Sequence, residues 1–335
     1  MPDPLLFSHP SSLEHETGFH HPERPDRIRA IEAELERRDW LGWGRREAPA
    51  AELEQIVAVH SQSHVDTVRE MSRRGGAFDL DTPVSPGSYD AALHAAGGAV
   101  ALVEELIRGE APTGFSVARP PGHHAERARA MGFCLFNNVA VAARHALDSL
   151  GVERVLVLDP DVHHGNGTNA IFHASPEVLF ASIHQWPFYP GTGALEDVGE
   201  GEGEGYSINL PVPARTGGDT VLSLVEHVVA PAAREFRPGL ILLSAGFDAH
   251  RDDPVGGCLL ETGDYAELAR ALRALGDELG APVGAVLEGG YDLDALAASV
   301  AATMEALAEG GEPRSVPADE LTLAEAERVR RHWAL

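Results

Sequence analysis

The chain has 335 residues, a formal net charge of −26 and 44% hydrophobic residues, which suffices for one large α/β domain with a buried core. Its acidity argues against a nucleic-acid-binding surface, which needs a basic stripe, and no segment has the ~20 consecutive apolar residues of a membrane span. The chain has only two cysteines, so no disulfide framework is predicted. Its N-terminus lacks a basic region followed by an apolar one, so no signal peptide is predicted either. Both features predict a cytoplasmic protein.

The first part of the chain is predicted to be mainly helical. One helix with an apolar stripe begins near Pro25. Two more are expected over Val57–Met71 and Tyr89–Ile107. The segment Trp40–Trp43 is typical of a connecting loop, and the turn-rich segment Phe78–Gly87 is typical of a surface loop.

A predicted strand over Phe115–Ala118 is followed by a rigid Pro-Pro-Gly turn and then by His123 and His124. Two adjacent histidines just after a strand are candidates for chemistry. The alternative is a pair of hydrogen-bonded loop residues. The next helix is expected over Val141–Leu150, with Asn138 as its N-cap.

The motif DPDVHHGNG, residues 159–167, directly follows an apolar strand predicted over Val155–Leu158. In open α/β sheets this end of a strand is where ligands bind. Because side chains alternate along an extended chain, Asp161 and His163 point the same way. A carboxylate and an imidazole suit zinc or another first-row divalent ion. The alternative is a hydrogen-bonded strand end without a metal.

The remaining elements alternate between strands and helices, which predicts a mostly parallel sheet with helices on both faces. No internal repeat or domain boundary is evident, so residues 1–335 are predicted to form one domain. Strands are expected over Val178–His184, Leu240–Asp248 and Val283–Leu287, and helices over Asp219–Glu235, Thr262–Leu279, Leu293–Leu307 and Ala318–Trp333.

Four of the predicted strand ends carry polar side chains. Asp248 joins Asp161 and His163 in a set of three ligands that leaves a coordination position open, which is typical of a catalytic metal. His123 and His124 then fit a general acid and a general base.

Three further residues complete the predicted chemistry. Tyr291 follows the last strand after two glycines, and its hydroxyl is predicted to donate to the oxyanion of a tetrahedral intermediate. Asp159 and Asn166 are suited to hold the two histidines in their working tautomers. Together these groups predict metal-assisted hydrolysis of an amide or ester.

Five segments together resemble the zinc-dependent histone deacetylase superfamily, especially its bacterial deacetylase-like and acetoin-utilisation-type members. They are RPPGHHA, GFCLFNN, DPDVHHGNGT, SAGFDAHRDDPVGG and EGGYDL, which occur in family order and, with HPERPDR, span most of the chain. The resemblance implies an arginase/deacetylase-like α/β fold. It also implies removal of acetyl or other short acyl groups from lysine side chains by a zinc enzyme.

The resemblance assigns residues as well. It implies one zinc ion on the three ligands and Tyr291 as the transition-state tyrosine. His124 matches the general base and pairs with Asn166, where many relatives have Asp, and His123 pairs with Asp159. The substrate-binding residues would be Asp81 at the rim, Gly132, Phe133 and Tyr189 in the tunnel and Arg27 in an internal channel. One structural K⁺ would use Asp159, Asp161, His163, Ser182 and Ile183, and a second would use Phe172, Ser175, Val178 and Tyr206.

Three alternatives are open. An acetylpolyamine amidohydrolase shares the site, but Val255 stands where polyamine-specific relatives have an acidic gatekeeper. An arginase-like ureohydrolase holds two manganese ions, but His250 stands where the second would need a carboxylate. A non-catalytic acyl-lysine reader is disfavoured by the intact Tyr291. The expected partners are an acetylated lysine protein or peptide, or an acetylated small amine, without nucleic acid or membrane, and a homo-oligomer is left open.

Overall fold

An eight-stranded parallel sheet forms the centre of this computed structural model, which describes residues 2–335. The strand order is β2-β1-β5-β10-β9-β6-β7-β8, and every pair of neighbours is parallel. A separate two-stranded antiparallel ribbon joins β3 (Gly76–Ala77) and β4 (Pro83–Val84). The strands of the large sheet are β1 (Leu5–Ser8), β2 (Gly44–Glu47), β5 (Thr113–Ser116), β6 (Val155–Asp159), β7 (Val178–Gln185), β8 (Ser207–Val212), β9 (Leu240–Ala245) and β10 (Val283–Leu287).

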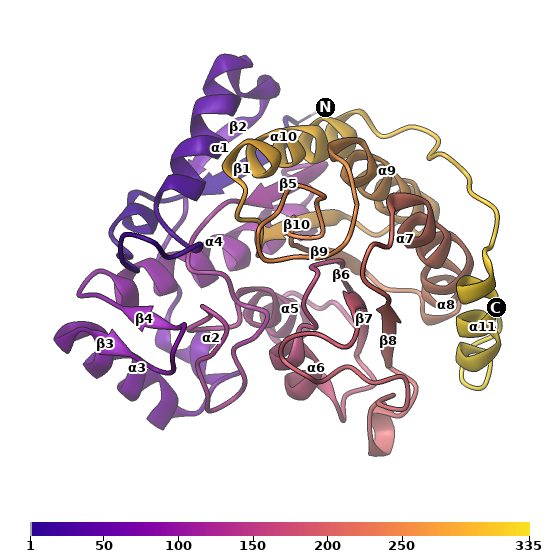
Figure 1. Ribbon diagram of the computed structural model, residues 1–335, viewed down its shortest axis with the longest axis horizontal. Coiled ribbons are helices and arrows are strands. Elements are labelled where there is room, and N and C mark those ends of the chain that lie inside the picture. Colours follow the sequence, from indigo (N-terminus) through magenta and orange to yellow (C-terminus); the bar gives the residue numbers. More distant parts are fainter. Residues whose placement is uncertain (1) are drawn as a thin grey trace.

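Helices cover both faces of this sheet (Figure 1). One face is covered by α2 (Leu53–Val57), α3 (Gln62–Arg74), α4 (Ser88–Arg108), α5 (Asn138–Ser149) and α6 (Asn166–Phe172). The other face is covered by α1 (Asp26–Arg37), α7 (Gly218–Leu224), α8 (Ala230–Phe236), α9 (Thr262–Leu279), α10 (Leu293–Glu309) and α11 (Glu320–Val329).

Side chains of the central strands alternate between two hydrophobic cores. In β6, Leu156 and Leu158 pack in the core beneath α9 and α10, whereas Val155 and Val157 pack in the core beneath α4 and α5. A strand whose successive side chains point to opposite faces needs apolar residues at every position when both faces are covered. The predicted α/β fold, with a mostly parallel sheet between two layers of helices, is confirmed.

The N-cap of α5 is Asn137 and not Asn138. The Asn137 side chain accepts a hydrogen bond from the backbone N–H of Ala140 at 3.0 Å. Asn138 already lies in the first turn, and its amide donates to the backbone oxygen of Pro120 at 3.0 Å. Two adjacent asparagines offer the same cap chemistry, and only the chain path selects between them.

Other local predictions also differ from the structure. The helix predicted over Val57–Met71 begins only at Gln62, because Ser61 caps α3, and Val57 is the last residue of the preceding helix α2. The helix predicted over Asp219–Glu235 contains a π-helical turn at Val225–Val229, which precedes Pro231, a residue without a backbone N–H.

The strands β1, β2 and β8 were not predicted. Residues just after the predicted loop Trp40–Trp43 form β2, an edge strand of sequence GRRE whose side chains are largely exposed. The opposite edge strand, β8, contains Pro211, which is compatible with an edge position. The pattern is weak only in β2, which has no apolar side chain; β1 and β8 carry buried apolar residues but are only four and six residues long. None of the helices described over residues 2–335 is long and apolar enough to cross a lipid bilayer.

Candidate active site

The predicted polar residues meet at the carboxyl ends of four neighbouring strands, β5, β10, β9 and β6. The chain after β5 carries His123 and His124, and the end of β6 begins the motif of residues 159–167. Asp248 follows β9, and Tyr291 follows β10. The strand order of the sheet therefore brings together residues that lie far apart in the sequence.

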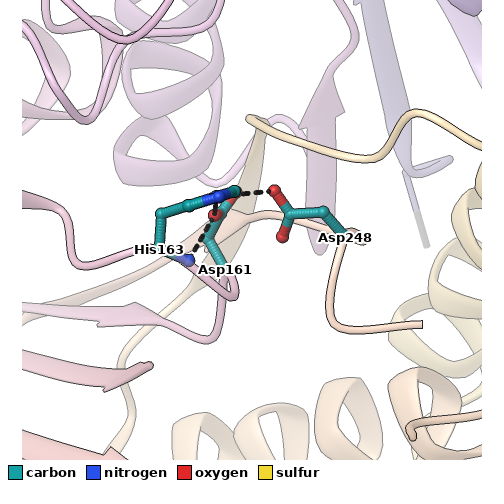
Figure 2. Close-up of side chains that lie close together, drawn as sticks. All are labelled: Asp161, His163 and Asp248. Carbon is teal, nitrogen blue, oxygen red and sulfur yellow. Dashed lines mark hydrogen bonds and ion pairs between the residues drawn. The ribbon is translucent and has the colours of Figure 1, made fainter. Parts of the chain in front are cut away.

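Asp161, His163 and Asp248 form the one group of three or more metal-ligating side chains found in residues 2–335, with one potential ligand atom of each within 4.8 Å of the others. The Nδ1 atom of His163 lies 3.2 Å from Asp161 Oδ1 and 3.1 Å from Asp248 Oδ2. Figure 2 shows the two carboxylates directed at the imidazole. Both aspartates are fully buried. Two buried carboxylates beside one imidazole nitrogen fit a bound cation, because a buried negative charge needs compensation.

Backbone contacts hold the two carboxylates in place. Asp248 Oδ1 accepts a hydrogen bond from the N–H of Val162 at 2.8 Å, and Asp161 Oδ2 accepts one from the N–H of Gly289 at 3.0 Å. A side chain at Gly246 would place its Cβ 2.1 Å from Asp161 Oδ2, so only glycine fits beside this carboxylate. The loops after β6, β9 and β10 are thus bonded directly to one another at the ligand set.

The two histidines stand next to the ligand set, each with one ring nitrogen occupied. His123 Nδ1 lies 3.0 Å from Asp159 Oδ2, and His124 Nδ1 lies 2.8 Å from Asn166 Oδ1. Both oxygens are acceptors, so each histidine carries a proton on Nδ1. The Nε2 atom of His124 is therefore left free for other partners. The ring centroid of His124 lies 5.9 Å from that of His163.

The pKa values of the two histidines are displaced in opposite directions. Burial would lower the pKa of His123, but the charges of Asp159 and Asp161 outweigh burial and raise it well above its ordinary value. Burial lowers the pKa of His124 well below its ordinary value, and the neighbouring His123 acts in the same direction. A cationic and a neutral imidazole therefore stand side by side.

Tyr291 closes another side of the site, with 9% of its surface exposed. Its ring packs edge-on against Phe133, with 5.7 Å between centroids, and the guanidinium of Arg27 lies 4.9 Å from its centroid. Burial raises the pKa of the hydroxyl well above its ordinary value, so the group is a neutral donor. Arg27 Nε also donates to the backbone oxygen of Gly290 at 2.6 Å.

A fully buried ionic cluster lies behind Tyr291. Glu23 forms ion pairs with Arg27, at 3.1 Å, and with Arg119, whose Nη2 donates to Glu23 Oε2 at 2.7 Å. Sequence reasoning selected Arg27 through the family resemblance but missed Glu23 and Arg119. Two signals were available in the sequence: Glu23 stands among arginines in HPERPDR, and Arg119 begins RPPGHH.

Two buried acids that hold backbone were also missed. Glu288 Oε2 accepts from the N–H of Gly122 at 2.6 Å and of His123 at 3.0 Å. Burial raises the pKa of Glu288 to about 7. Asp253 Oδ2 accepts from the N–H of Tyr291 at 2.6 Å. Glu288 thus fixes the histidine loop, and Asp253 fixes the backbone of Tyr291.

Two of the predicted substrate-binding residues, Tyr189 and Phe133, pack against side chains of this site on the side that reaches the surface, its entrance, where Tyr189 is 37% exposed. Arg27 lies instead in the buried cluster behind Tyr291. Tyr189 lies over His124, with 5.2 Å between ring centroids, and Phe188 stacks on His163 at 5.2 Å. Burial, and then the charge of Asp81, raises the pKa of the Tyr189 hydroxyl, so Asp81 lies near the same entrance. Phe188 is the aromatic residue nearest the ligand set in this loop, and the resemblance did not select it.

The loop of Asp81 is joined to the N-terminal loop beside the entrance. His21 Nε2 lies 3.0 Å from the backbone oxygen of Asp81, and the His21 ring packs edge-on against Phe133 at 4.7 Å. Phe19 and Leu80, in these two loops, are 90% and 107% exposed. Each of these two joined loops therefore carries one exposed apolar side chain.

Gly132 is required by its conformation and by His124. Its φ is +56°, a left-handed conformation that favours glycine, and a Cβ there would lie 2.4 Å from His124 Cδ2. The bulk of any other residue would displace the His124 ring. Gly132 thus determines how closely the chain approaches this histidine.

The residues assigned to the first potassium ion lie next to the ligand set, at the carboxyl end of β6. Asp159 of β6 pairs in register with Ser182 of β7, and Ile183 follows Ser182. The second group lies at the other end of β7: Phe172, Ser175 and Val178 run from the end of α6 to the start of β7, and Tyr206 directly precedes β8. There the N–H of Ser175 donates to the oxygen of Phe172 at 2.9 Å, and the oxygen of Tyr206 accepts from Phe180 at 2.9 Å. Val178 is the first residue of β7.

Comparisons with known proteins agree with this arrangement. A family model described as histone deacetylase domain matches residues 21–307. A probable deacetylase of Archaeoglobus fulgidus is 38% identical over 294 residues, which cover 86% of this chain and 81% of that protein. A histone deacetylase-like amidohydrolase of Pseudomonas aeruginosa is 40% identical over 249 residues, which cover 73% of this chain and 66% of that protein.

A solved structure is also similar to this chain. The crystal structure of the HDA15 HD domain superposes with a TM-score of 0.92 at 37% identity, covering 99% of this chain and 96% of that one. Fold, site and relatives together define a hydrolase of amide bonds. The chain belongs to the histone deacetylase family, and the resemblance inferred from its motifs is confirmed.

Proposed function

We propose that this protein is a zinc-dependent deacetylase that removes acetyl groups from lysine side chains of proteins or peptides. One observation carries the proposal: a three-ligand set, a neutral histidine and a buried tyrosine hydroxyl lie at one sheet edge. Amide hydrolysis needs an activated water, a base and a donor to the oxyanion, and each of these has a candidate there.

The ligand set fits zinc. One imidazole nitrogen and two carboxylate oxygens are ligand types of Zn²⁺, whereas Mg²⁺ and Ca²⁺ prefer oxygen alone. When bound, the ion would polarise the acetyl carbonyl and lower the pKa of a water molecule toward ~7. The ligands would be Asp161, His163 and Asp248.

The protein side chains would then move the protons. His124, neutral and with Nε2 free, takes a proton from the attacking water and returns it to the lysine nitrogen as the amide C–N bond breaks. His123, kept cationic by Asp159, stabilises the negative charge that develops nearby. Tyr291 donates its hydroxyl hydrogen to the oxyanion, a contribution of roughly 3–4 kcal/mol for one donor in other enzymes.

The entrance supports a polypeptide substrate. Phe133 and Tyr189 offer apolar walls for the aliphatic stem of acetyl-lysine, and the Asp81 carboxylate is available to accept hydrogen bonds from substrate backbone N–H groups. Phe19 and Leu80, exposed in the two loops that the contact of His21 with Asp81 joins, are available to contact residues that flank the lysine. An acetylated polyamine would have no such flanks.

Structural K⁺ and a cytoplasmic location belong to the same proposal, with residues 1–335 acting as one catalytic domain. The first K⁺ would use the Asp159 carboxylate, which lies in register with Ser182. Backbone oxygens of the neighbouring segments would complete its coordination. Potassium dependence of the melting temperature, measured against sodium at equal ionic strength, tests these sites, and identical melting curves would count against them.

The deciding experiment is a substrate screen on the purified protein with metal analysis. We expect one zinc ion per chain and turnover of acetyl-lysine peptides well above that of acetylputrescine and acetylspermidine. Preferred turnover of the polyamines would replace the substrate class. Two manganese ions per chain would indicate a ureohydrolase. Binding of acetyl-lysine peptides without turnover by the zinc-loaded protein would indicate a reader and refute the proposal.

A further inference from the structure

The side chain of Asn166 lies between His124 and Glu126 and is 5% exposed. Its Oδ1 lies 2.8 Å from His124 Nδ1. On the other side, its Nδ2 donates to Glu126 Oε1 at 2.8 Å, to the backbone oxygen of His124 at 3.4 Å and to Met131 Sδ at 3.5 Å. The shortest of the three contacts of the amide nitrogen is thus the one to the Glu126 carboxylate.

An asparagine amide has a donor end and an acceptor end of nearly equal size, so its partners determine which end faces which way. If the Asn166 amide were reversed, Oδ1 would face two acceptors, Glu126 Oε1 and the backbone oxygen of His124. Its Nδ2 would then donate to His124 Nδ1. The proton of His124 would consequently move to Nε2, the nitrogen that must be unprotonated in a base.

We infer that Glu126 is a positioning residue that holds the Asn166 amide in one orientation and thereby keeps the proton of His124 on Nδ1. A carboxylate accepts hydrogen bonds and cannot donate them, so it rejects the reversed amide. The consequence for catalysis rests on the proposed role of His124 as a base. The effect of Glu126 on the tautomer of His124 does not depend on that proposed role.

The backbone holds Glu126 in position for this role. Residues Glu126 and Arg129 exchange two backbone hydrogen bonds, at 2.9 Å and 3.4 Å, in an isolated antiparallel bridge. The backbone oxygen of Glu126 also lies 2.9 Å from the Nδ1 atom of the buried His60. The carboxylate therefore extends from a fixed point toward Asn166.

Three variants separate orientation from a merely structural role. Glutamine at position 126 can donate as well as accept, so Glu126→Gln supports both orientations of Asn166. We expect kcat for an acetyl-lysine peptide to fall about 10- to 100-fold, with KM changed less than about twofold. Asn166→Asp cannot be reversed, but it places a second carboxylate beside Glu126 and should also be slow. The third variant combines both changes, so that the introduced glutamine amide can donate to the introduced aspartate carboxylate.

We therefore expect the double variant to recover to within about threefold of wild-type kcat, although each single change is harmful. Glu202→Gln, a change of an exposed glutamate in the 201–203 turn, is the matched control and should leave kcat unchanged. Zinc content and melting temperature should be the same in all variants. A double variant slower than both single variants, or Glu126→Gln at wild-type kcat, would overturn the inference.

A second readout does not depend on activity. The ¹⁵N shifts of the imidazole of His124, assigned by their loss in a His124→Asn protein, report which nitrogen carries the proton. We expect the Nδ1–H tautomer in the wild type and in the double variant, and a mixture in Glu126→Gln. An unmixed Nδ1–H tautomer in Glu126→Gln would refute the role of Glu126. A wild type with this tautomer but without deacetylase turnover would instead refute the proposed function.

Discussion

Asp253 gives the sharpest test of how the site is held together. Its carboxylate is 7% exposed and accepts three backbone hydrogen bonds, from Tyr291 at 2.6 Å, from Asp292 at 3.2 Å and from Val255 at 2.9 Å. It thus ties the loop after β9, which carries Asp248, to the loop after β10, which carries the tyrosine. Asp253→Ala would leave three N–H groups without this partner.

The expected loss follows from these contacts. A hydrogen bond contributes roughly 0.5–1.5 kcal/mol, and roughly 1.5–3 kcal/mol when its acceptor is charged; burial raises the pKa of Asp253 to about 7, so this carboxyl is only partly charged at neutral pH. Because such terms are not additive and water will enter the vacated space, we expect Asp253→Ala to lower the free energy of unfolding by about 3–5 kcal/mol. That corresponds to a fall in Tm of roughly 4–7 °C for a chain of this size. The loosened Tyr291 should lower kcat by about 10- to 100-fold.

Asp252→Ala is the matched control for this change. Asp252 is the preceding residue and is exposed, and its carboxylate lies 3.7 Å from the Nδ1 atom of His250, an imidazole whose pKa burial lowers. We expect its replacement to change stability by less than about 0.5 kcal/mol. The assay is thermal unfolding combined with peptide turnover on zinc-loaded protein. Equal Tm and equal kcat for the two alanine variants would refute the role of Asp253.

Three further changes test the site. Tyr291→Phe should keep zinc and fold but lower kcat by about 10²–10³-fold, since the ring contacts remain and only the oxyanion donor is lost; wild-type turnover would contradict this. Asp248→Ala should release the metal, and unchanged zinc content by elemental analysis would remove Asp248 from the ligand set. Gly132→Ala should lower kcat far more than Gly109→Ala, because only at Gly132 would a Cβ meet the His124 ring; equal kinetics in the two variants would rule this out.

The fold could be predicted wherever burial imposed a pattern. The central strands β6, β9 and β10 are apolar at nearly every position because both of their faces are covered, and each was expected close to its observed bounds. The edge strand β2 carries none of that pattern, and it was missed. The edge strand β8 alternates buried apolar residues with others, but it is short and contains Pro211, and it was missed too. The interruption of the long helix before α8 was missed too, because its apolar periodicity continues through the π-helical turn at Val225–Val229.

The site was predictable to the extent that its residues have a recognisable chemistry at a strand end. Asp161, His163 and Asp248 were selected on that basis, and the structure brings them together. Glu288 and Asp253 were not selected because their main partners are backbone N–H groups. Every residue except proline has such a group, so a carboxylate that binds backbone leaves no pairing signal in the sequence.

The acidic residues of the site therefore divide into two kinds with different physical demands. Asp161 and Asp248 face each other across one imidazole, and their buried charge fits a bound cation. Asp253 and Glu288 are satisfied by hydrogen bonds from the surrounding loops and need no ion. Asp253 ties the loop of Asp248 to that of Tyr291, and Glu288 ties the end of β10 to the histidine loop, so removal of the metal should leave these three loops in place. Precise placement of the tyrosine and of the histidine loop then depends on acids whose main partners are backbone N–H groups.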